Sequence, residues 1–146
     1  MKILIQRVKS ASVSIDDKLY SSISQGLLVF IGIEKNDTED CAKYLADKIL
    51  KLRIFEDENN KMNLSVTDIN GELLIVSQFT LAGDTKKGTR PSFDNAMAPQ
   101  MAKDMYEKFI TMIKNKRLNV QTGVFGAMMD ITLINDGPVT FILEKN

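Results

Sequence analysis

The stretch GLLVFIGI, residues 26–33, is the longest apolar run in the chain. A continuous apolar run of this length, bounded by Gly26 and Glu34, indicates a strand that is buried on both faces. The run is far too short to span a membrane. We therefore expect a central strand that other parts of the chain cover on both sides.

Apolar patterns on either side of this run predict further strands. From Lys2 to Ile15 apolar and polar residues alternate, with one shift at Val8, which is the period of a half-buried strand. The remaining predicted strands cover about residues 19–23, 73–81, 121–133 and 139–143. The chain is therefore expected to be mostly strand.

Two segments carry apolar residues at helical spacing instead. The first covers about residues 38–52, after the capping types Asp37 and Thr38. The second starts at Pro99, which suits a first helical turn, and should end near Asn115. With 146 residues, the chain has the size of one domain. We predict a compact, strand-rich α/β domain over residues 1–146 with two amphipathic helices.

Histidine is absent from the sequence, and Cys41 is its only cysteine. A Ser-His-Asp triad or a Cys-His pair within one chain is therefore excluded, as are zinc sites of His and Cys. We expect Cys41 to be a small buried apolar residue. The first residues, MKILIQRVKS, resemble neither a signal peptide nor a transit peptide, so we expect a cytoplasmic protein.

Polar residues interrupt the apolar stretch LLIVSQFTL, residues 73–81. Strand alternation would place Ser77 and Phe79 on one face and Gln78 and Thr80 on the other. Their hydroxyl and carboxamide groups could donate hydrogen bonds to a ligand carbonyl. The alternative is that these are ordinary polar residues on the wet face of a strand.

Residues 135–140, NDGPVT, have the composition of a turn between two strands. General X-Pro frequencies predict a trans bond before Pro138. The Gly137-Pro138 pair offers two carbonyl groups and no N–H at Pro138. It would form a rigid acceptor surface if it lined a pocket.

Residues 82–98 lack periodicity and form a loop of a length that is usually functional or disordered. Its cations Lys86, Lys87 and Arg90 could contact phosphate, or they could simply be solvated. Phe125 has small neighbours that would let a ligand approach its ring, or it could be a core aromatic.

Five stretches, taken in order, closely resemble the D-aminoacyl-tRNA deacylase family. They are MKILIQRVKSASVSI at the start, KMNLSV at 61–66, SQFTLAGDTKKGTRPSF at 77–93, VQTGVFGA at 120–127 and INDGPVT at 134–140. The resemblance covers essentially the whole chain. It implies a barrel-like domain that forms a homodimer with two active sites at the interface.

The resemblance also implies an activity, namely hydrolysis of the ester that joins a D-amino acid to the 3′ adenosine of tRNA. Glycine mischarged on tRNA is removed in this family too. No cofactor and no metal are implied, and neither DNA nor a membrane is an implied partner.

Carried over residue by residue, the resemblance implies four groups of site residues. Ser77, Gln78, Phe79 and Thr80 would form the pocket wall, and Gly137 and Pro138, joined by a cis bond, would reach in from the other subunit as a chiral filter. Arg7 would steady that dipeptide, and Phe125 would sit near the terminal adenine. From their charge rather than from the resemblance, we expect Lys86, Lys87 and Arg90 to form a local patch that contacts the tRNA end. Val124 and Met128 stand where the family commonly has Arg and Asp.

A protein without histidine needs another route to ester hydrolysis. We expect backbone N–H groups near Phe79 and Thr80 to hold the carbonyl oxygen, with the ribose 2′-hydroxyl of the substrate assisting water. Thr80 as a covalent nucleophile is the competing version. Three other functions remain open: an editing-domain-like deacylase for an L-amino acid, a non-catalytic RNA-binding module, and a structural dimerisation domain.

Overall fold

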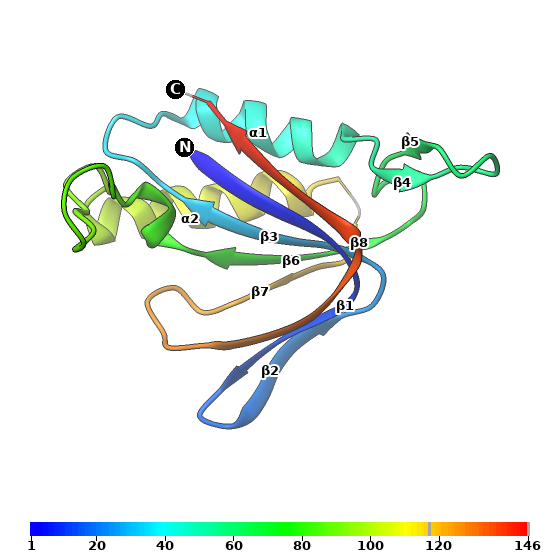
Figure 1. Ribbon diagram of the computed structural model, residues 1–146, viewed down its shortest axis with the longest axis horizontal. Coiled ribbons are helices and arrows are strands. Elements are labelled where there is room, and N and C mark those ends of the chain that lie inside the picture. The colour runs from blue at the N-terminus through cyan, green and yellow to red at the C-terminus, as the bar shows by residue number, and fades with distance from the viewer. Residues whose placement is uncertain (117, 146) are drawn as a thin grey trace.

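The computed structural model describes residues 1–116 and 118–145 (Figure 1). Six strands form one sheet in the order β2-β1-β3-β6-β7, with β8 paired to the other edge of β1, and β4 and β5 form a small second sheet. The elements are β1 (Lys2–Ile15), β2 (Lys18–Ile23), β3 (Gly26–Gly32), α1 (Glu39–Lys51), β4 (Phe55–Glu56), β5 (Met62–Leu64), β6 (Glu72–Ser77), the 3-10 helix η1 (Phe79–Ala82), α2 (Pro99–Lys114), β7 (Val120–Thr122) and β8 (Asp130–Glu144).

The predicted central strand is confirmed as β3, which pairs antiparallel with β1 and parallel with β6. Leu27, Val29 and Ile31 point into a core beneath the two helices. Leu28 points to the opposite face, into a second core with residues of β1 and β6. The sheet is therefore buried on both faces, as a continuous apolar run requires.

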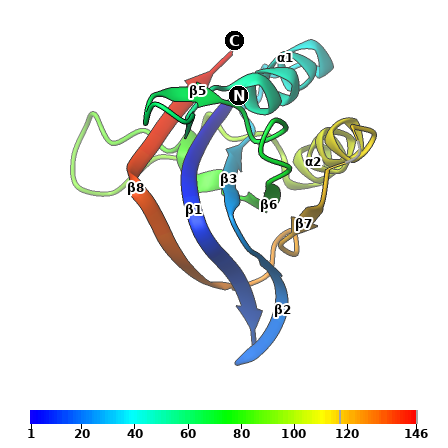
Figure 2. The same cartoon turned by 90° about the vertical axis from the view of Figure 1, so that its right-hand side faces the viewer.

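The second core exists because the sheet curls. The first half of β1 pairs with β3 and the second half with β2, while β8 follows its other edge throughout. Figure 2 shows β8, β1 and β2 curving together away from the helices. The result is a nearly closed, barrel-like sheet, and the predicted shift of alternation at Val8 coincides with irregularities in the pairing of β1 with β8.

Both predicted helices are confirmed, and they lie on the same side of the sheet (Figure 2). The Thr38 side chain caps α1 by accepting from the Cys41 N–H, and Cys41 is buried as predicted. Phe109 and Ile113 bury the inner face of α2. Within residues 1–116 and 118–145 no helix is long and apolar enough to cross a membrane.

Two predictions about strands are wrong. The strand predicted over residues 73–81 ends at Ser77, and Phe79–Ala82 form a 3-10 turn that folds over Gly32 at the end of β3. The two strands predicted near the C-terminus are instead the short β7 and one long strand, β8, which begins at Asp130 and runs through the segment predicted as a turn.

The β8 strand stays continuous because β1 continues beside it on both sides of an outward excursion. Asn135 pairs with Val8 and Thr140 with Gln6, so the four residues between them lie opposite Arg7 alone. The segment 136–139 is therefore an excursion of a paired strand rather than a connection between two strands.

Candidate functional site

The pocket-wall residues predicted from the sequence lie where β6 gives way to η1. The Gln78 N–H donates to the Ile31 carbonyl at 2.7 Å and so extends the β6 pairing by one bond. The chain then turns, leaving Phe79 57% exposed. The first N–H groups of a helical turn have no partner within it, and in the described part of the chain the backbone N–H groups of Phe79 and Thr80 make no hydrogen bond. Two adjacent main-chain donors at this turn thus have no partner among the described residues.

Gly32 makes this turn possible through a close approach. A Cβ atom at Gly32 would lie 2.6 Å from the Leu81 Cβ and 3.2 Å from the Gln78 carbonyl oxygen. Because carbon atoms do not approach this closely, a larger residue at position 32 would push η1 off the end of β3. The absence of a side chain at Gly32 therefore fixes the height of the turn above the sheet.

The expected alternation of the four pocket-wall residues is wrong, because residues 79–82 are helical rather than extended. The Gln78 carboxamide nevertheless reaches the Thr80 hydroxyl, to which its Nε2 donates. Across the two described ranges, no carboxylate or amine contacts that hydroxyl. Thr80 therefore has a donor beside it and no proton acceptor of the kind that activates a nucleophile.

An aromatic contact joins the η1 turn to the loop that follows it. The rings of Phe79 and Phe93 are tilted against each other with their centroids 5.0 Å apart. Two backbone hydrogen bonds between Asp84 and Ser92, of 2.8 and 2.9 Å, close the loop at its base. The loop is therefore held beside η1.

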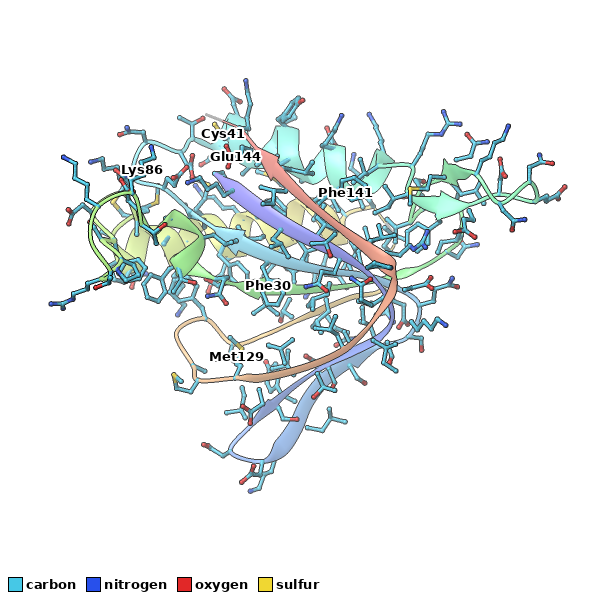
Figure 3. All side chains as sticks on the ribbon, viewed as in Figure 1. Phe30, Cys41, Lys86, Met129, Phe141 and Glu144 are labelled. Atoms are coloured by element: carbon cyan, nitrogen blue, oxygen red, sulfur yellow. The ribbon has the colours of Figure 1, made fainter. Side chains whose placement is uncertain are left out.

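The three predicted cations all lie on this closed loop, between Asp84 and Ser92. Lys86, Lys87 and Arg90 are exposed, and none forms an ion pair with another residue of the described ranges. Figure 3 shows Lys86 at the outer edge of the molecule. The structure brings these cations to the same end of the sheet as the pocket wall.

Gly137 and Pro138 lie at the tip of the β8 excursion and are exposed. The bond between them is cis, as the family resemblance implies and against the general X-Pro expectation. A Cβ atom at Gly137 would lie 2.2 Å from the Val139 backbone nitrogen. No residue but glycine fits there without a shift of the main chain.

Arg7 holds the base of this excursion. Its side chain is only 6% exposed, and its Nε and Nη1 donate to the carbonyls of Asp136 and Ile54, each at 2.7 Å. The carboxylates of Asp136 and Glu56 lie 3.5 and 3.6 Å from the guanidinium. A buried cation is tolerated only with such partners, so Arg7 ties the excursion to the β4 region.

The Gly137-Pro138 dipeptide and the η1 turn of one chain are far apart. Arg7, beside the excursion, pairs with Leu27 of β3, whereas Gln78 bonds to Ile31. Four residues of strand separate these two positions, or about 13 Å. A single chain therefore does not bring Gly137 and Pro138 to its own η1 turn.

Phe125 is partly buried rather than presented to solvent. Its ring lies 5.9 Å from the ring of Tyr106, whose hydroxyl donates to the Ile75 carbonyl at 2.8 Å. Burial raises the pKa of Tyr106, so the phenol stays protonated and acts as a donor. Phe125 thus packs at the edge of the core, while Met128 in the same loop is 91% exposed.

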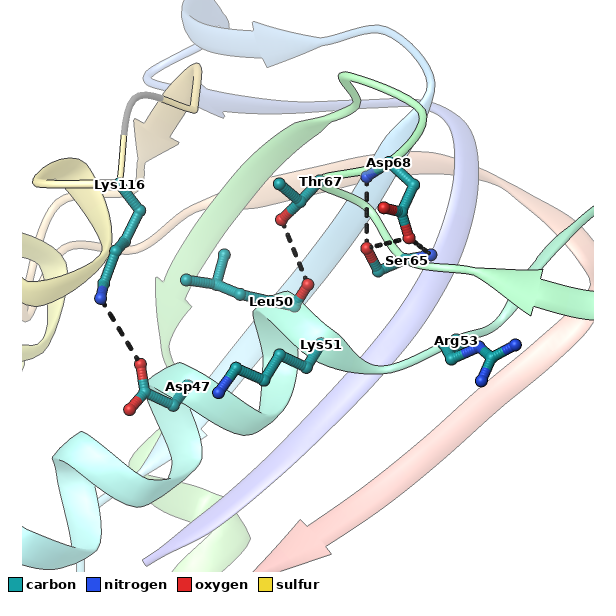
Figure 4. Close-up of a pocket in the computed structure, with 8 residues that line it drawn as sticks. All are labelled: Asp47, Leu50, Lys51, Arg53, Ser65, Thr67, Asp68 and Lys116. Atoms are coloured by element: carbon teal, nitrogen blue, oxygen red, sulfur yellow. Dashed lines mark hydrogen bonds and ion pairs between the residues drawn. The ribbon is translucent and has the colours of Figure 1, made fainter.

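A separate hollow of about 460 Å³ lies at the C-terminal end of α1 (Figure 4). Its polar groups mostly satisfy one another: Lys116 lies 3.9 Å from Asp47, and the Ser65 hydroxyl and N–H donate to Asp68. These bonds hold the pKa of the Asp68 carboxyl below its usual value. None of the lining residues belongs to η1 or β8.

Known proteins match this chain over its full length. The model of the family described as D-Tyr-tRNA(Tyr) deacylase matches residues 4–144. The D-aminoacyl-tRNA deacylase of Thermosipho africanus (strain TCF52B) is 56% identical over 99% of this chain and 97% of its own. That of Exiguobacterium sp. (strain ATCC BAA-1283 / AT1b) is 52% identical over 100% and 99%.

A solved structure shares the fold as well. The structure titled "c-Myc DNA Unwinding Element Binding Protein" superimposes with a TM-score of 0.95 at 40% identity, covering 100% of this chain and 99% of its own. The barrel-like sheet with two helices on one side is therefore a fold that occurs in known proteins.

The close approach at Gly32 can be tested by Gly32→Ala. We expect a loss of about 1–3 kcal/mol in the free energy of unfolding, because the added methyl group overpacks the contact with Leu81. The amide chemical shifts of residues 79–82 should also change in the Gly32→Ala variant. Urea unfolding measures the stability, and NMR spectra measure the shifts. Ser22→Ala, on an exposed position of β2, is the control. Unchanged amide shifts in η1 would contradict the assigned contact.

Proposed function

The chain belongs to the D-Tyr-tRNA(Tyr) deacylase family, and from this premise we propose that it hydrolyses the ester bond of D-aminoacyl-tRNA to free tRNA and a D-amino acid. The observation that carries the proposal is the match of residues 4–144, supported by relatives named D-aminoacyl-tRNA deacylase at 52–56% identity. The reaction proofreads translation, removes glycine from mischarged tRNA as well, and takes place in the cytoplasm.

The proposed chemistry uses main-chain donors in place of a histidine. The Phe79 and Thr80 N–H groups have no other partner in the described residues and would stabilise the oxyanion that forms when water adds to the ester carbonyl. One well-placed donor contributes roughly 3–4 kcal/mol to such a transition state. The bond to the ribose 3′ oxygen then breaks, and that oxygen takes up a proton as the tRNA leaves.

Water, rather than Thr80, is the proposed nucleophile. The Thr80 hydroxyl accepts from Gln78, and a carboxamide donor does not remove a proton. The 2′-hydroxyl of the substrate ribose lies next to the ester in any aminoacyl-tRNA, where it can orient the attacking water. An aminoacyl ester is already activated, so positioning and oxyanion stabilisation suffice.

Chirality is proposed to be read by the carbonyl groups of Gly137 and Pro138. These groups would accept from the substrate ammonium and leave no room for a side chain of L configuration. D side chains point away from the dipeptide, so many of them are tolerated. Glycine has no side chain and passes the filter.

The filter is proposed to act on the pocket of a second copy, in a homodimer. Within one chain the two parts lie about 13 Å apart along β3, which supports completion by a partner. The outer edge of β8 has no strand beside it in the described residues, and Ile134 and Ile142 on that strand are 56% and 66% exposed. Exposed apolar residues on an unpaired edge favour an interface.

The proposed contact with tRNA is confined to its aminoacylated end. Nineteen basic and nineteen acidic residues leave the chain without net charge, so it lacks a general attraction for phosphate. The exposed cations Lys86, Lys87 and Arg90 stand beside the η1 turn and would meet the terminal phosphates. Phe125 is proposed to lie near the terminal adenine, reached through its exposed side.

Deacylation of D-tyrosyl-, L-tyrosyl- and glycyl-tRNA by one preparation tests the activity. We expect release of amino acid from the D- and glycyl esters and none above background from the L-ester, because only an L side chain meets the filter. Efficient hydrolysis of the L-ester would favour an editing enzyme for L-amino acids. Binding of tRNA without hydrolysis would favour a nucleic-acid-binding module.

The choice of nucleophile is tested by Thr80→Val and by a substrate with a 2′-deoxy terminal adenosine. Thr80→Val should keep kcat within about threefold of the wild type, because the threonine hydroxyl takes no part in bond formation. The 2′-deoxy ester should react at least roughly a hundredfold more slowly. A Thr80→Val protein without turnover would restore the covalent mechanism, and a fully reactive 2′-deoxy ester would exclude assistance by the ribose.

Mixed dimers test the composite site. Phe79→Pro removes one donor of the pocket, and Gly137→Ala distorts the filter through the contact with the Val139 nitrogen. Each variant alone should be inactive toward D-tyrosyl-tRNA. Unfolded together and refolded at equal amounts, they should recover roughly a quarter of the wild-type activity, because half of the dimers then contain one intact composite site. Recovery at background level would contradict completion by a second copy.

A further inference from the structure

The Asn135 side chain closes the β8 excursion at its base. Its Oδ1 accepts from the Val139 N–H at 2.8 Å, and its Nδ2 lies 3.1 Å from the Val139 carbonyl oxygen. The same Nδ2 lies within 3.1 Å of the Gln6 Oε1 on β1 and 3.3 Å of the Thr140 Oγ1. One carboxamide thus joins both ends of the excursion to each other and to the neighbouring strand.

These contacts replace the strand ladder where it is interrupted. Residues 136–139 have no pairing partner on β1 in the described part of the chain, so the ladder alone leaves them unsupported. Arg7 fixes the first of these residues through the Asp136 carbonyl, and Asn135 fixes the last through both main-chain groups of Val139. Gly137 and Pro138 lie between the two fixed points.

The position of Val139 constrains the position of the dipeptide directly. Its side chain is buried, and its main chain lies so close to Gly137 that no Cβ atom fits between them. Any displacement of Val139 therefore displaces Gly137 as well. We propose that Asn135 is a positioning residue for stereospecificity, which aims the Gly137 and Pro138 carbonyls at the substrate; this inference rests on the proposed function of that dipeptide.

A carboxamide supplies both kinds of hydrogen bond at this position. Asparagine donates and accepts, whereas an ionised aspartate only accepts. Asn135→Asp would keep the bond from the Val139 N–H and place a second carboxylate oxygen against the Val139 carbonyl. Asn135→Ala would remove every contact and leave main-chain groups of a buried residue without a partner.

The test measures kcat/KM for D-tyrosyl- and L-tyrosyl-tRNA in Asn135→Ala and Asn135→Asp. We expect the ratio of D to L to fall at least roughly tenfold in both variants, since a loosely held dipeptide excludes an L side chain poorly. Asn119→Ala is the matched control, because it removes a carboxamide bond to Glu72 outside the excursion. Its ratio should equal that of the wild type.

The ratio separates positioning from a merely structural role, which would lower both rate constants together. Thermal unfolding of each variant is recorded alongside. If Asn135→Ala does not fold, the D-to-L ratio of kcat/KM in Asn135→Asp tests the inference. An unchanged ratio in a folded Asn135 variant would overturn the inference while leaving the deacylase function intact. Failure of the wild-type protein to hydrolyse D-tyrosyl-tRNA would instead overturn the proposed function itself.

Discussion

The burial of β3 on both faces is the constraint on which the rest of the structure depends. One face is covered by α1 and α2, but the other has no helix to cover it. The chain covers it by curling its own sheet, so β1 must be long enough to pair with β3 along one half and with β2 along the other. A long, bent β1 in turn provides a partner for the equally long β8, and the pairing irregularities near Val8 give β8 room for its excursion. The η1 turn and the β8 excursion thus lie near opposite ends of the same buried strand.

Arg7 is a buried charged residue whose contacts hold the base of the β8 excursion in place. A buried guanidinium without partners would be strongly destabilising, and its charge must be met by oxygen atoms from several directions. Those oxygen atoms come from the excursion of β8 and from the β4 region, segments that β1 does not otherwise hold together. The need to satisfy one buried cation therefore fixes the position of an exposed dipeptide.

The sequence predicts the parts of this structure that obey a regular period. The run at 26–33, the alternation of β1 and both helices follow from burial patterns, and all are confirmed.

The end of β6 cannot be predicted from such a period. The turn at Phe79 depends on the space above Gly32, and that space is set by a contact between residues distant in sequence. The sequence does not predict that β8 is continuous, for a similar reason. Asn, Asp, Gly and Pro favour a turn locally, and the strand continues past them because it pairs with β1 on both sides. Asn135 is part of the quoted INDGPVT stretch, yet no property of the residue alone reveals four contacts made across an excursion.

In the proposed site, which contains no histidine, the main chain performs the recognition. Neither Ser77–Ala82 nor Gly137–Pro138 contains a side chain that titrates near neutral pH. The groups proposed to meet a substrate are therefore N–H donors at one end and carbonyl acceptors at the other. Apart from a change to proline, which removes an N–H, a substitution cannot exchange a main-chain group and can only move it. Selectivity in such a site therefore depends on the residues that fix backbone position, namely Gly32 beneath the turn and Arg7 and Asn135 at the base of the excursion. Because Arg7 and Asn135 fix only the carbonyl end, substitutions there should change which substrates are accepted more than the chemistry of ester cleavage, whereas a substitution at Gly32 would move the proposed oxyanion donors.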